Sequence, residues 1–394
     1  MLDALASVGE LRARFGITRI GETTRLQRIG IPTMCAIVPN SDDDLSIYNG
    51  RGLTRDQALI SAVMEAVERQ TAVRCELAHR VAAAESVAGL NLQLCGLNAA
   101  FRRTPMPFVP ARDLLTGECI EVPKALVQMP WRGVPAFAST HTNGLAAAFT
   151  LEDAVHNALF ELTERHLYAV THARAHLRPK RLLERILGTG ELPFVDDPAE
   201  EIVQPTGVDE VDVLCARFAR AGLRVRLMAL RAAGMPLGVL AGAHDPERGD
   251  FRAGLGCSWA PANAAVRALT EAAQARAADI QAARENILRA QDPPSAYTAN
   301  TRRRASLPRG RWYFDGPVQH VRLRDLPGTS QGVSADLHAL VEAIGTIATR
   351  IAVVDLSPPD GAFFVVRAVV PELETTLLDG RIGPIARAII ERAV

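Results

Sequence analysis

The chain has 394 residues, of which 48% are hydrophobic and 22% are charged, and its formal net charge is zero at pH 7. This composition is typical of a globular protein with enough apolar residues for a large core. Because there is no excess of positive charge, we expect neither nucleic acid nor a membrane surface as a partner.

The cysteines and the amino terminus indicate a reducing compartment. The six cysteines are scattered, without a Cys-x-x-Cys pair or a Cys/His spacing typical of zinc sites. This argues against structural zinc, against a disulfide framework and against a hydrolase that relies on a metal alone. The first residues include acids where a signal peptide would be basic, and no apolar run reaches membrane-spanning length. We therefore expect a cytoplasmic protein.

The periodicity of apolar residues predicts alternating helices and strands. In the amino-terminal half we expect a helix over residues 1–14, strands over 33–38 and 45–48, a helix over about 56–78, a strand over 137–142 and a helix from 151 to about 175. Residues 80–130 hold short elements. Within them, Pro105, Pro107 and Pro110 indicate a connector.

The carboxy-terminal half continues the alternation. We expect a helical piece from residue 179, a linker over 189–208, a helix over 208–221, strands over 223–230 and 237–243, and a further helix from residue 263. Beyond it we expect a basic loop over 300–311, a helix over 335–350, strands over 351–356 and 362–370, and a last helix over 384–394. The order of elements predicts an α/β (α+β) protein, and the hairpins favour mixed or antiparallel sheets.

One pattern, a glycine-bearing loop followed by a helix with polar residues three positions apart, occurs in three copies. These polar pairs are Glu65 and Glu68, Glu161 and Glu164, and Glu271 and Gln274. Each copy has an alanine seven positions before its first glutamate, at Ala58, Ala154 and Ala264. Residues three or seven apart share one helix face. The pattern predicts an internal structural repeat with units over about 33–78, 137–175 and 236–285.

The repeated acids favour a metal site over a merely solvated helix face. Two carboxylates on one face repel each other, and a cation relieves that repulsion. Glu65, Glu68, Glu161 and Glu164 are enough to hold more than one Mg²⁺, which prefers oxygen ligands and usually bridges to substrate phosphates. No Walker A motif or kinase signature is present, so a nucleotide site here would be of an unusual kind.

These motifs resemble those of the YcaO superfamily. Gly-Arg-Gly-Leu-Thr, Thr-Asn-Gly-Leu-Ala-Ala and Gly-Leu-Gly-Cys each precede their helix in the expected order, and the similarity runs from about Gly16 through Leu373. Thr-Arg-Leu-Gln-Arg-Ile-Gly-Ile-Pro and Thr-Glu-Ala-Ala-Gln-Ala-Arg are most similar to the TfuA-associated branch. The resemblance implies a YcaO-type fold, a single catalytic domain over residues 1–394 and a homodimer.

The resemblance also implies a reaction and a set of site residues. Such enzymes use ATP and Mg²⁺ to activate a backbone amide of a peptide or protein: a nucleophile adds to the carbonyl, ATP phosphorylates the oxyanion, and phosphate leaves. By position, the Mg²⁺ ligands are Glu65, Glu68, Glu161 and Glu164. The implied nucleotide-binding residues are Ser46, Arg51, Ser61, Asn143, Asn157, Glu271, Gln274 and Arg276.

The sequence departs from the family's pattern at several of these positions. Arg51 replaces the usual Lys, Gln27 replaces an acid, Ser258 replaces a common His, and Asn157 stands where Gln or His is more usual. Arginine still binds phosphate, as a planar fork instead of a compact charge.

The nucleophile decides the product. The carboxyl terminus has no proline-rich tail of the azoline-forming branch, and the chain has no room for a fused peptide-recognition domain. The resemblance therefore favours thioamide formation, with sulfide supplied by a separate TfuA-like partner. The alternatives are an azoline- or amidine-forming cyclodehydratase of a ribosomal peptide pathway and, in another class, an inactive nucleotide-binding scaffold.

Overall fold

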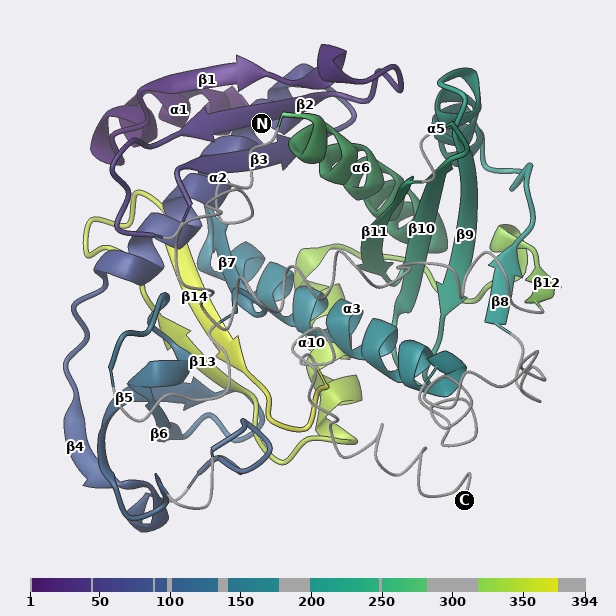
Figure 1. Ribbon diagram of the computed structural model, residues 1–394. Helices are drawn as coiled ribbons and strands as arrows, with labels where there is room; N and C mark the ends of the chain where they lie inside the picture. The colour runs from purple at the N-terminus through teal and green to yellow at the C-terminus, as the bar shows by residue number, and fades with distance from the viewer. Residues whose placement is uncertain are drawn as a thin grey trace, which may run out of the picture.

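The computed structural model describes residues 2–43, 45–87, 89–97, 101–133, 141–176, 199–247, 250–281 and 318–374. Within these ranges the strands form a three-stranded, a five-stranded and a six-stranded sheet. Figure 1 shows the long helices α2, α3 and α6 on the inner sides of these sheets. None of the described helices is both long and apolar enough to cross a membrane.

The amino-terminal unit is a three-stranded antiparallel sheet covered by two helices. It consists of α1 (Leu2–Arg14), β1 (Arg19–Glu22), the short η1 (Thr24–Leu26), β2 (Thr33–Ile37), β3 (Ile47–Arg51) and α2 (Arg55–Arg74). Helix α2 begins after Thr54, whose side-chain oxygen accepts a hydrogen bond from the backbone of Gln57 while the Gln57 amide oxygen accepts one from the backbone of Thr54. This reciprocal cap fixes where the helix starts.

The six-stranded sheet joins the middle of the chain to its carboxy-terminal part. Its elements are β4 (Arg80–Ala83), η2 (Ala84–Ser86), β5 (Pro105–Asp113), β6 (Cys119–Pro123), η4 (Lys124–Leu126), β7 (Leu145–Ala148), β13 (Ala352–Asp355) and β14 (Phe364–Val369). The strand order is β4-β5-β13-β14-β7, with β6 also paired to β5. Helix α3 (Leu151–His176) packs on β7 and β14, and α10 (Val333–Gly345) packs on α3.

The five-stranded sheet carries the third repeat helix. Its elements are β8 (Ala199–Ile202), α5 (Asp209–Arg220), β9 (Arg224–Leu230), β10 (Leu237–Asp245), β11 (Asp250–Ser258), α6 (Pro261–Ile280), β12 (Val318–Val321) and η5 (Leu323–Asp325). Strands β8 and β12 are parallel and the other pairs are antiparallel, in the order β11-β10-β9-β8-β12. Helix α6 packs on β10 and β11 and also contacts β3 of the amino-terminal unit.

Glycine and alanine let two of the repeat helices approach their strands at backbone distance. A Cβ added at Gly50 of β3 would lie 2.3 Å from the carbonyl oxygen of Ala58, and one at Gly256 of β11 would lie 2.2 Å from the carbonyl oxygen of Ala264. Both alanines are fully buried. The alanine seven positions before the first glutamate therefore marks a close helix-on-strand contact in the first and third repeats.

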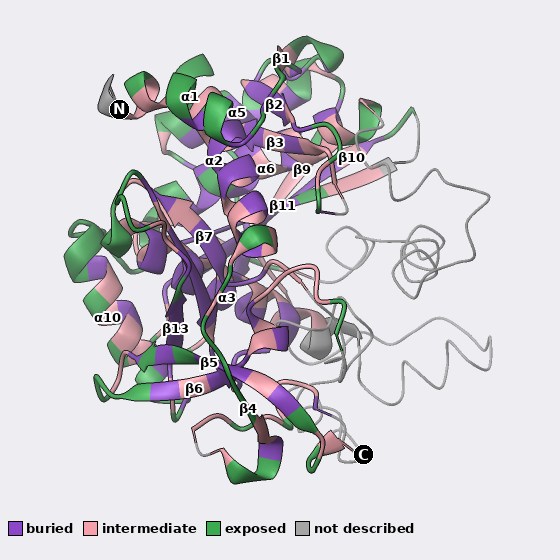
Figure 2. Ribbon diagram, turned by 90° about the vertical axis from the view of Figure 1, so that its left-hand side faces the viewer, coloured by how far each residue is buried: buried purple, intermediate pink, exposed green. Residues whose placement is uncertain are grey.

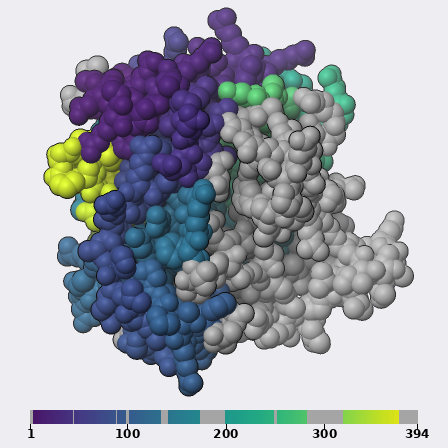
Figure 3. All heavy atoms as spheres, turned by 60° about the vertical axis from the view of Figure 1, so that its left-hand side comes forward, coloured from purple at the N-terminus to yellow at the C-terminus, as the bar shows by residue number. Residues whose placement is uncertain are grey.

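The apolar core fills the space between the helices and the sheets. Figure 2 shows buried residues along β7 and β13 in the interior, whereas exposed residues are frequent on α1 and α5 at the surface. Leu159 and Leu240 are among the large, fully buried side chains of one core cluster, and Phe218 belongs to another. In the space-filling view of Figure 3 the amino-terminal unit, coloured purple, forms one end of the visible face.

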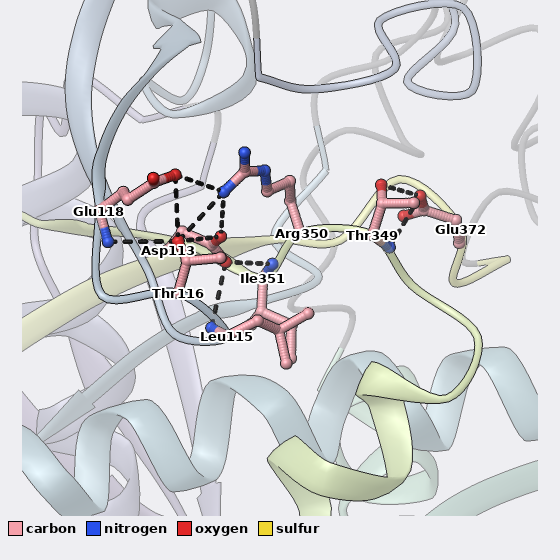
Figure 4. Close-up of polar contacts among 8 residues, drawn as sticks. All are labelled: Asp113, Leu115, Thr116, Glu118, Thr349, Arg350, Ile351 and Glu372. Carbon is pink, nitrogen blue, oxygen red and sulfur yellow. Dashed lines mark hydrogen bonds and ion pairs between the residues drawn. The ribbon is translucent and has the colours of Figure 1, made fainter.

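A polar cluster at the end of β5 fastens this strand to β13 (Figure 4). The buried carboxylate of Asp113 accepts hydrogen bonds from Arg350 at 2.7 Å and from the backbone of Ile351 at 3.0 Å. Thr116 and the exposed Glu118 complete the contacts around the Arg350 guanidinium. A buried carboxylate is tolerated at this end of β5 because both of its oxygens accept hydrogen bonds.

The predicted fold class is confirmed, since helices and mixed or antiparallel sheets alternate along the described chain. The hairpin before the helix is present in the first and third repeats, as β2–β3 and β10–β11. Helix α2 ends at Arg74, four residues before the predicted end at 78, and β3 begins two residues later than the predicted strand.

The predicted connector at Pro105, Pro107 and Pro110 is wrong. All three prolines lie in β5, where the first two pair with β4 and the third pairs with β6. Proline has no backbone N–H to donate to a neighbouring strand. Each of these prolines pairs with a strand on one side of β5 only, so the missing N–H does not leave a second neighbouring strand without a donor.

Several predictions fall partly or wholly outside the described residues. Of the predicted linker, residues 199–202 form β8, and residues 189–198 lie outside the described ranges. The same holds for most of the strand predicted before the central repeat, for the helical piece from residue 179, for the basic loop and for the last helix.

Candidate functional site

A pocket of about 820 Å³ lies between the three repeat helices. Helices α2, α3 and α6 each present one face to it, as the spacing in the sequence predicts. The predicted site residues that line it are Arg51, Ser61, Glu65, Glu68, Asn157, Glu161, Glu164, Glu271 and Gln274. The structure therefore brings together residues that lie more than 200 positions apart in the sequence.

The glutamates of α2 face the pocket, but the arginine that follows them does not. Arg69 donates two hydrogen bonds to Asp43, from Nε at 2.6 Å and from Nη2 at 2.8 Å, and both side chains are buried. Burial raises the pKa of Glu65, and burial together with the nearby charges of Glu65 and Glu161 raises the pKa of Glu68 well above its usual value. Among the residues that the structure describes, no ion pair joins Glu65 or Glu68 to a cationic side chain, although the charge of Arg69 opposes both pKa shifts.

In α3 the corresponding arginine lies among the pocket carboxylates. The guanidinium of Arg165 is 3.6 Å from Glu161, 3.4 Å from Glu164 and 3.9 Å from Glu271. The backbone N–H of Gly144, in the turn before β7, donates to Glu161 at 3.0 Å. The same Glu-x-x-Glu-Arg sequence thus gives its arginine different partners in the first and second repeats.

The loop arginine of the first repeat reaches across to the third repeat helix. Arg51, at the end of β3, donates to the carboxylate of Glu271 at 2.8 Å and to the amide oxygen of Gln274 at 2.7 Å. Gln274 in turn donates to the backbone oxygen of Asn49 at 2.7 Å. These contacts connect α6 to the strand that precedes α2.

Burial and mutual repulsion disfavour the charged forms of the pocket acids. Burial raises the pKa of Glu164 to about 7, against the opposing effect of Arg165 and with added repulsion from Glu271 and Glu161. Burial likewise raises the pKa of Glu161. Arg367 of β14 is buried nearby, which lowers its pKa to about 10, and its Nε donates to the carbonyl oxygen of Leu126. A cation that enters the pocket would stabilise the ionised carboxylates.

The donor set fits Mg²⁺ only in combination with another ligand. Carboxylate oxygens are the ligands that this ion prefers. Within the described ranges, however, no three Asp, Glu, His or Cys side chains lie close enough to form a metal site by themselves. Mg²⁺ is commonly held by one or two carboxylates together with substrate phosphates, and the four glutamates fit that arrangement.

Three predicted nucleotide-site residues lie outside the pocket lining. The backbone oxygen of Ser46 accepts a hydrogen bond from Val38, and Asn143 is buried in the turn before β7. The guanidinium of Arg276 lies 2.7 Å from Asp245. A role of these residues toward nucleotide stays a prediction.

Two of the residues at which the sequence departs from the family pattern have structural contacts. The side chain of Gln27 donates to the backbone oxygen of Ala273 in α6 at 2.9 Å. Ser258 caps the turn before α6, because its hydroxyl accepts from the backbone of Ala260 at 3.1 Å.

The pocket also contains residues that the sequence analysis did not assign to the site. They include Gln57, Arg165, Arg267 and Thr270. Arg267 and Thr270 precede Glu271 by four positions and one position, so helical spacing alone identifies Arg267 as a member of the same face. Arg165 follows Glu164 directly, and only the tertiary structure distinguishes it from Arg69.

Comparisons with known proteins identify the family. Residues 49–374 match a family model described as YcaO cyclodehydratase, which binds ATP and Mg²⁺. An uncharacterized protein of Methanothermobacter thermautotrophicus is 31% identical over 400 residues, which are 98% of this chain and 98% of that protein. An uncharacterized protein in the tfuA 3′ region of Rhizobium leguminosarum bv. trifolii is 31% identical over 391 residues, covering 92% of this chain and 85% of that protein.

A solved structure shares the fold. YcaO from Methanopyrus kandleri, bound with AMPPCP and Mg²⁺, superposes with a TM-score of 0.66 at 24% identity, covering 96% of this chain and 92% of that one. The predicted cofactors, ATP and Mg²⁺, are those that the family description names. From the extent of the family match and the identity over nearly the full length, this chain belongs to the YcaO family.

Proposed function

We propose that this protein uses ATP and Mg²⁺ to activate a backbone amide of a peptide or protein, and that the product is a thioamide. The observation that carries the proposal is the pocket between three repeat helices, in which half-buried glutamates and arginines converge. The family description supports the use of ATP and Mg²⁺.

In this proposal the acidic residues of the pocket bind the metal ion and the basic residues bind the phosphates. Glu65, Glu68, Glu161 and Glu164 would hold Mg²⁺ through carboxylate oxygens, and Arg51 with Arg165 would bind phosphate oxygens. Ser61, Asn157 and Gln274 would donate hydrogen bonds to the nucleotide. Bound ATP supplies a phosphoryl group that makes the amide oxygen a leaving group, and the half-buried walls limit competing attack by water.

The proposal of a thioamide product and of a TfuA-like partner is based on a related protein. A protein that is 31% identical over most of this chain is named for its position in a tfuA 3′ region. We infer that a TfuA-like protein delivers sulfide to the activated amide of this protein's substrate. The family's description as a cyclodehydratase favours a second candidate, in which a substrate side chain attacks and an azoline forms.

Nucleotide binding tests the pocket. We expect Mg²⁺·AMPPCP to bind the wild-type protein in a calorimetric titration and to bind much more weakly to Glu65→Gln and Glu161→Gln. Glu152→Gln is the matched control, because Glu152 lies on the same helix as Glu161 but is exposed and outside the pocket lining. Undiminished binding in both pocket variants would instead favour a structural role for these acids.

Mass spectrometry tests the product. Proteomes of cells with and without this gene would be compared for peptides in which one backbone oxygen is exchanged for sulfur. The proposal predicts such peptides only in cells that carry the gene. Peptides that have lost one water at Cys, Ser or Thr would support the cyclodehydratase, and ATP binding without any peptide change would support the scaffold.

A further inference from the structure

Arg165 neutralises Glu161 and Glu164, two of the four carboxylates that a metal ion would need, and Arg51 neutralises Glu271 in the same pocket. Arg51 is hydrogen-bonded to Glu271 at 2.8 Å. Arg165 lies 3.4 Å from Glu164, 3.6 Å from Glu161 and 3.9 Å from Glu271. Exposed fractions of 11% to 31% for these side chains mean that water screens the pairs only in part.

These ion pairs hold the carboxylates apart. Arg51 draws Glu271 toward β3, and the Arg165 guanidinium lies between the acids of α3 and the acid of α6. This arrangement agrees with the finding that no three acidic, His or Cys side chains of the described residues converge on one point. A divalent ion that bound Glu161 or Glu164 alone would have to displace Arg165, which would then remain in a half-buried pocket without its partner. An ion at Glu65 would be repelled by Arg51, whose positive charge acts on that carboxylate.

Nucleotide phosphate removes this obstacle. Arginine forms bidentate hydrogen bonds with phosphate oxygens, just as it does with carboxylates. When phosphate takes Arg51 and Arg165, the glutamates that were paired with them become free to bind the ion that the phosphate carries.

We propose that Arg51 and Arg165 block the binding of free divalent metal, so that Mg²⁺ enters this pocket only together with nucleotide phosphates. Arg51 is the specific element of this chain. Its planar fork contacts both Glu271 and Gln274, whereas the ammonium group of a lysine is a point charge that does not reproduce this paired geometry. The proposal extends the proposed function only in its use of a metal–nucleotide complex and does not depend on the sulfur chemistry.

The test uses Mn²⁺ as a probe, because free Mn²⁺ is quantified by its paramagnetic resonance signal and it takes the same oxygen ligands. We expect the nucleotide-free wild-type protein to leave this signal unchanged. Arg51→Gln should bind Mn²⁺ alone about tenfold or more tightly than wild type, within the usual range of coupling between sites. The same variant should bind Mg²⁺·AMPPCP more weakly, because it has lost a phosphate ligand.

Further variants keep the test decisive. Arg252→Gln removes an arginine of β11 that is paired with Asp279 outside the pocket, so it should behave as wild type. Adding Glu271→Gln to Arg51→Gln should abolish the gained affinity. If Arg51→Gln does not fold, Arg51→Lys keeps the charge and should show a smaller gain.

Two results would overturn the proposal. One is tight binding of Mn²⁺ alone to the wild-type protein, and the other is no gain of Mn²⁺ binding in a folded Arg51 variant. Because the assay contains no peptide, sulfide or ATP turnover, its outcome is separate from whether a thioamide forms.

Discussion

The guanidinium of Arg350 lies 2.7 Å from the carboxylate of Asp113, 237 positions earlier in the chain. The other oxygen of Asp113 accepts from the backbone of Ile351 at 3.0 Å and of Leu115 at 3.2 Å. Because β13 follows Ile351 directly, this one buried side chain positions the strand that joins β5 to β14.

Replacing Asp113 with alanine should destabilise the protein. The substitution leaves the backbone N–H of Ile351 without its acceptor in a buried position, and such a loss lowers the free energy of unfolding by about 1–3 kcal/mol. Urea denaturation of the two proteins measures the difference. Glu118→Ala is the control, because Glu118 contacts the same arginine from an exposed position and its loss should leave the midpoint unchanged.

The contribution of Asp113 should disappear in acid. Burial alone would raise the pKa of Asp113, but hydrogen bonds from Arg350, Ile351 and Thr116 outweigh it and lower that pKa. A lowered folded-state pKa gives stability that is complete above the unfolded value of about 4 and is lost as pH falls through the folded one. The difference between wild type and Asp113→Ala should therefore be constant near neutrality and shrink in strong acid. A difference that grows in acid contradicts this assignment.

Gly50→Ala should destabilise the first repeat severely. The new Cβ would lie 2.1 Å from the backbone nitrogen of Ala62, so α2 would have to move away from β3. We expect a lower melting temperature and weaker binding of Mg²⁺·AMPPCP, because α2 carries two of the pocket acids. Gly9→Ala is the matched control of opposite sign: nothing lies within 4 Å of its Cβ position, and alanine in a helix is more stable than glycine by about 0.5–1 kcal/mol.

Arg69→Ala should destabilise the protein more than the loss of a surface arginine does. Asp43, of which only 2% of the side chain is exposed, would remain as a buried charge without its bidentate partner. Loss of one member of a buried pair lowers the free energy of unfolding by about 3–5 kcal/mol. Denaturant titration measures it, with the exposed Arg14 of the Arg14–Asp360 pair replaced by alanine as the comparison. Equal effects of the two substitutions would contradict the assignment.

Metal–nucleotide binding should depend on pH near neutrality. Burial raises the pKa of Glu164 to about 7, so a proton competes with Mg²⁺ for this carboxylate as pH falls below that value. We expect the affinity for Mg²⁺·AMPPCP to decrease from pH 8 to pH 6 and the decrease to be smaller in Glu164→Gln. Calorimetry across this range, in buffers of different ionisation enthalpy, also counts the protons released.

The raised pKa of Glu164 should make the stability of the nucleotide-free protein change with pH in the opposite direction to its affinity for nucleotide. The folded state binds the proton of Glu164 more tightly than the unfolded chain does, so stability should rise as pH falls from 8 toward 5. In Glu164→Gln this part of the pH dependence should be missing. Thermal melting of the nucleotide-free proteins at several pH values measures the effect.

Local sequence patterns were enough to predict the three repeat helices and the face that each presents. Residues such as Glu65, Glu161 and Glu271 recur with helical spacing after a glycine loop, and both features depend on neighbours in the sequence. For the same reason the hairpins β2–β3 and β10–β11 were predictable. Arg267 was within reach of the same argument, four positions before Glu271.

Other features depend on contacts between distant segments. Residues 105–110 form a strand despite their prolines because β4 and β6 pair with it. The partners of Arg69 and Arg165 differ because Asp43 lies near one arginine and α6 lies near the other. Strand pairing and ion-pair partners of this kind depend on segments far apart in the sequence, so secondary-structure propensity and residue spacing alone do not predict them.

The backbone contact at Gly50 and Gly256 has a consequence for how much the sequence around the pocket can change. In these contacts α2 and α6 lie against backbone atoms of β3 and β11. Backbone atoms do not change when a side chain is substituted, so these contacts keep both helices in position. Apolar residues elsewhere can then be exchanged without moving the carboxylates, which is consistent with a shared fold at 24% identity. A designer who redesigns this core should therefore keep the glycines and their facing alanines and vary the rest.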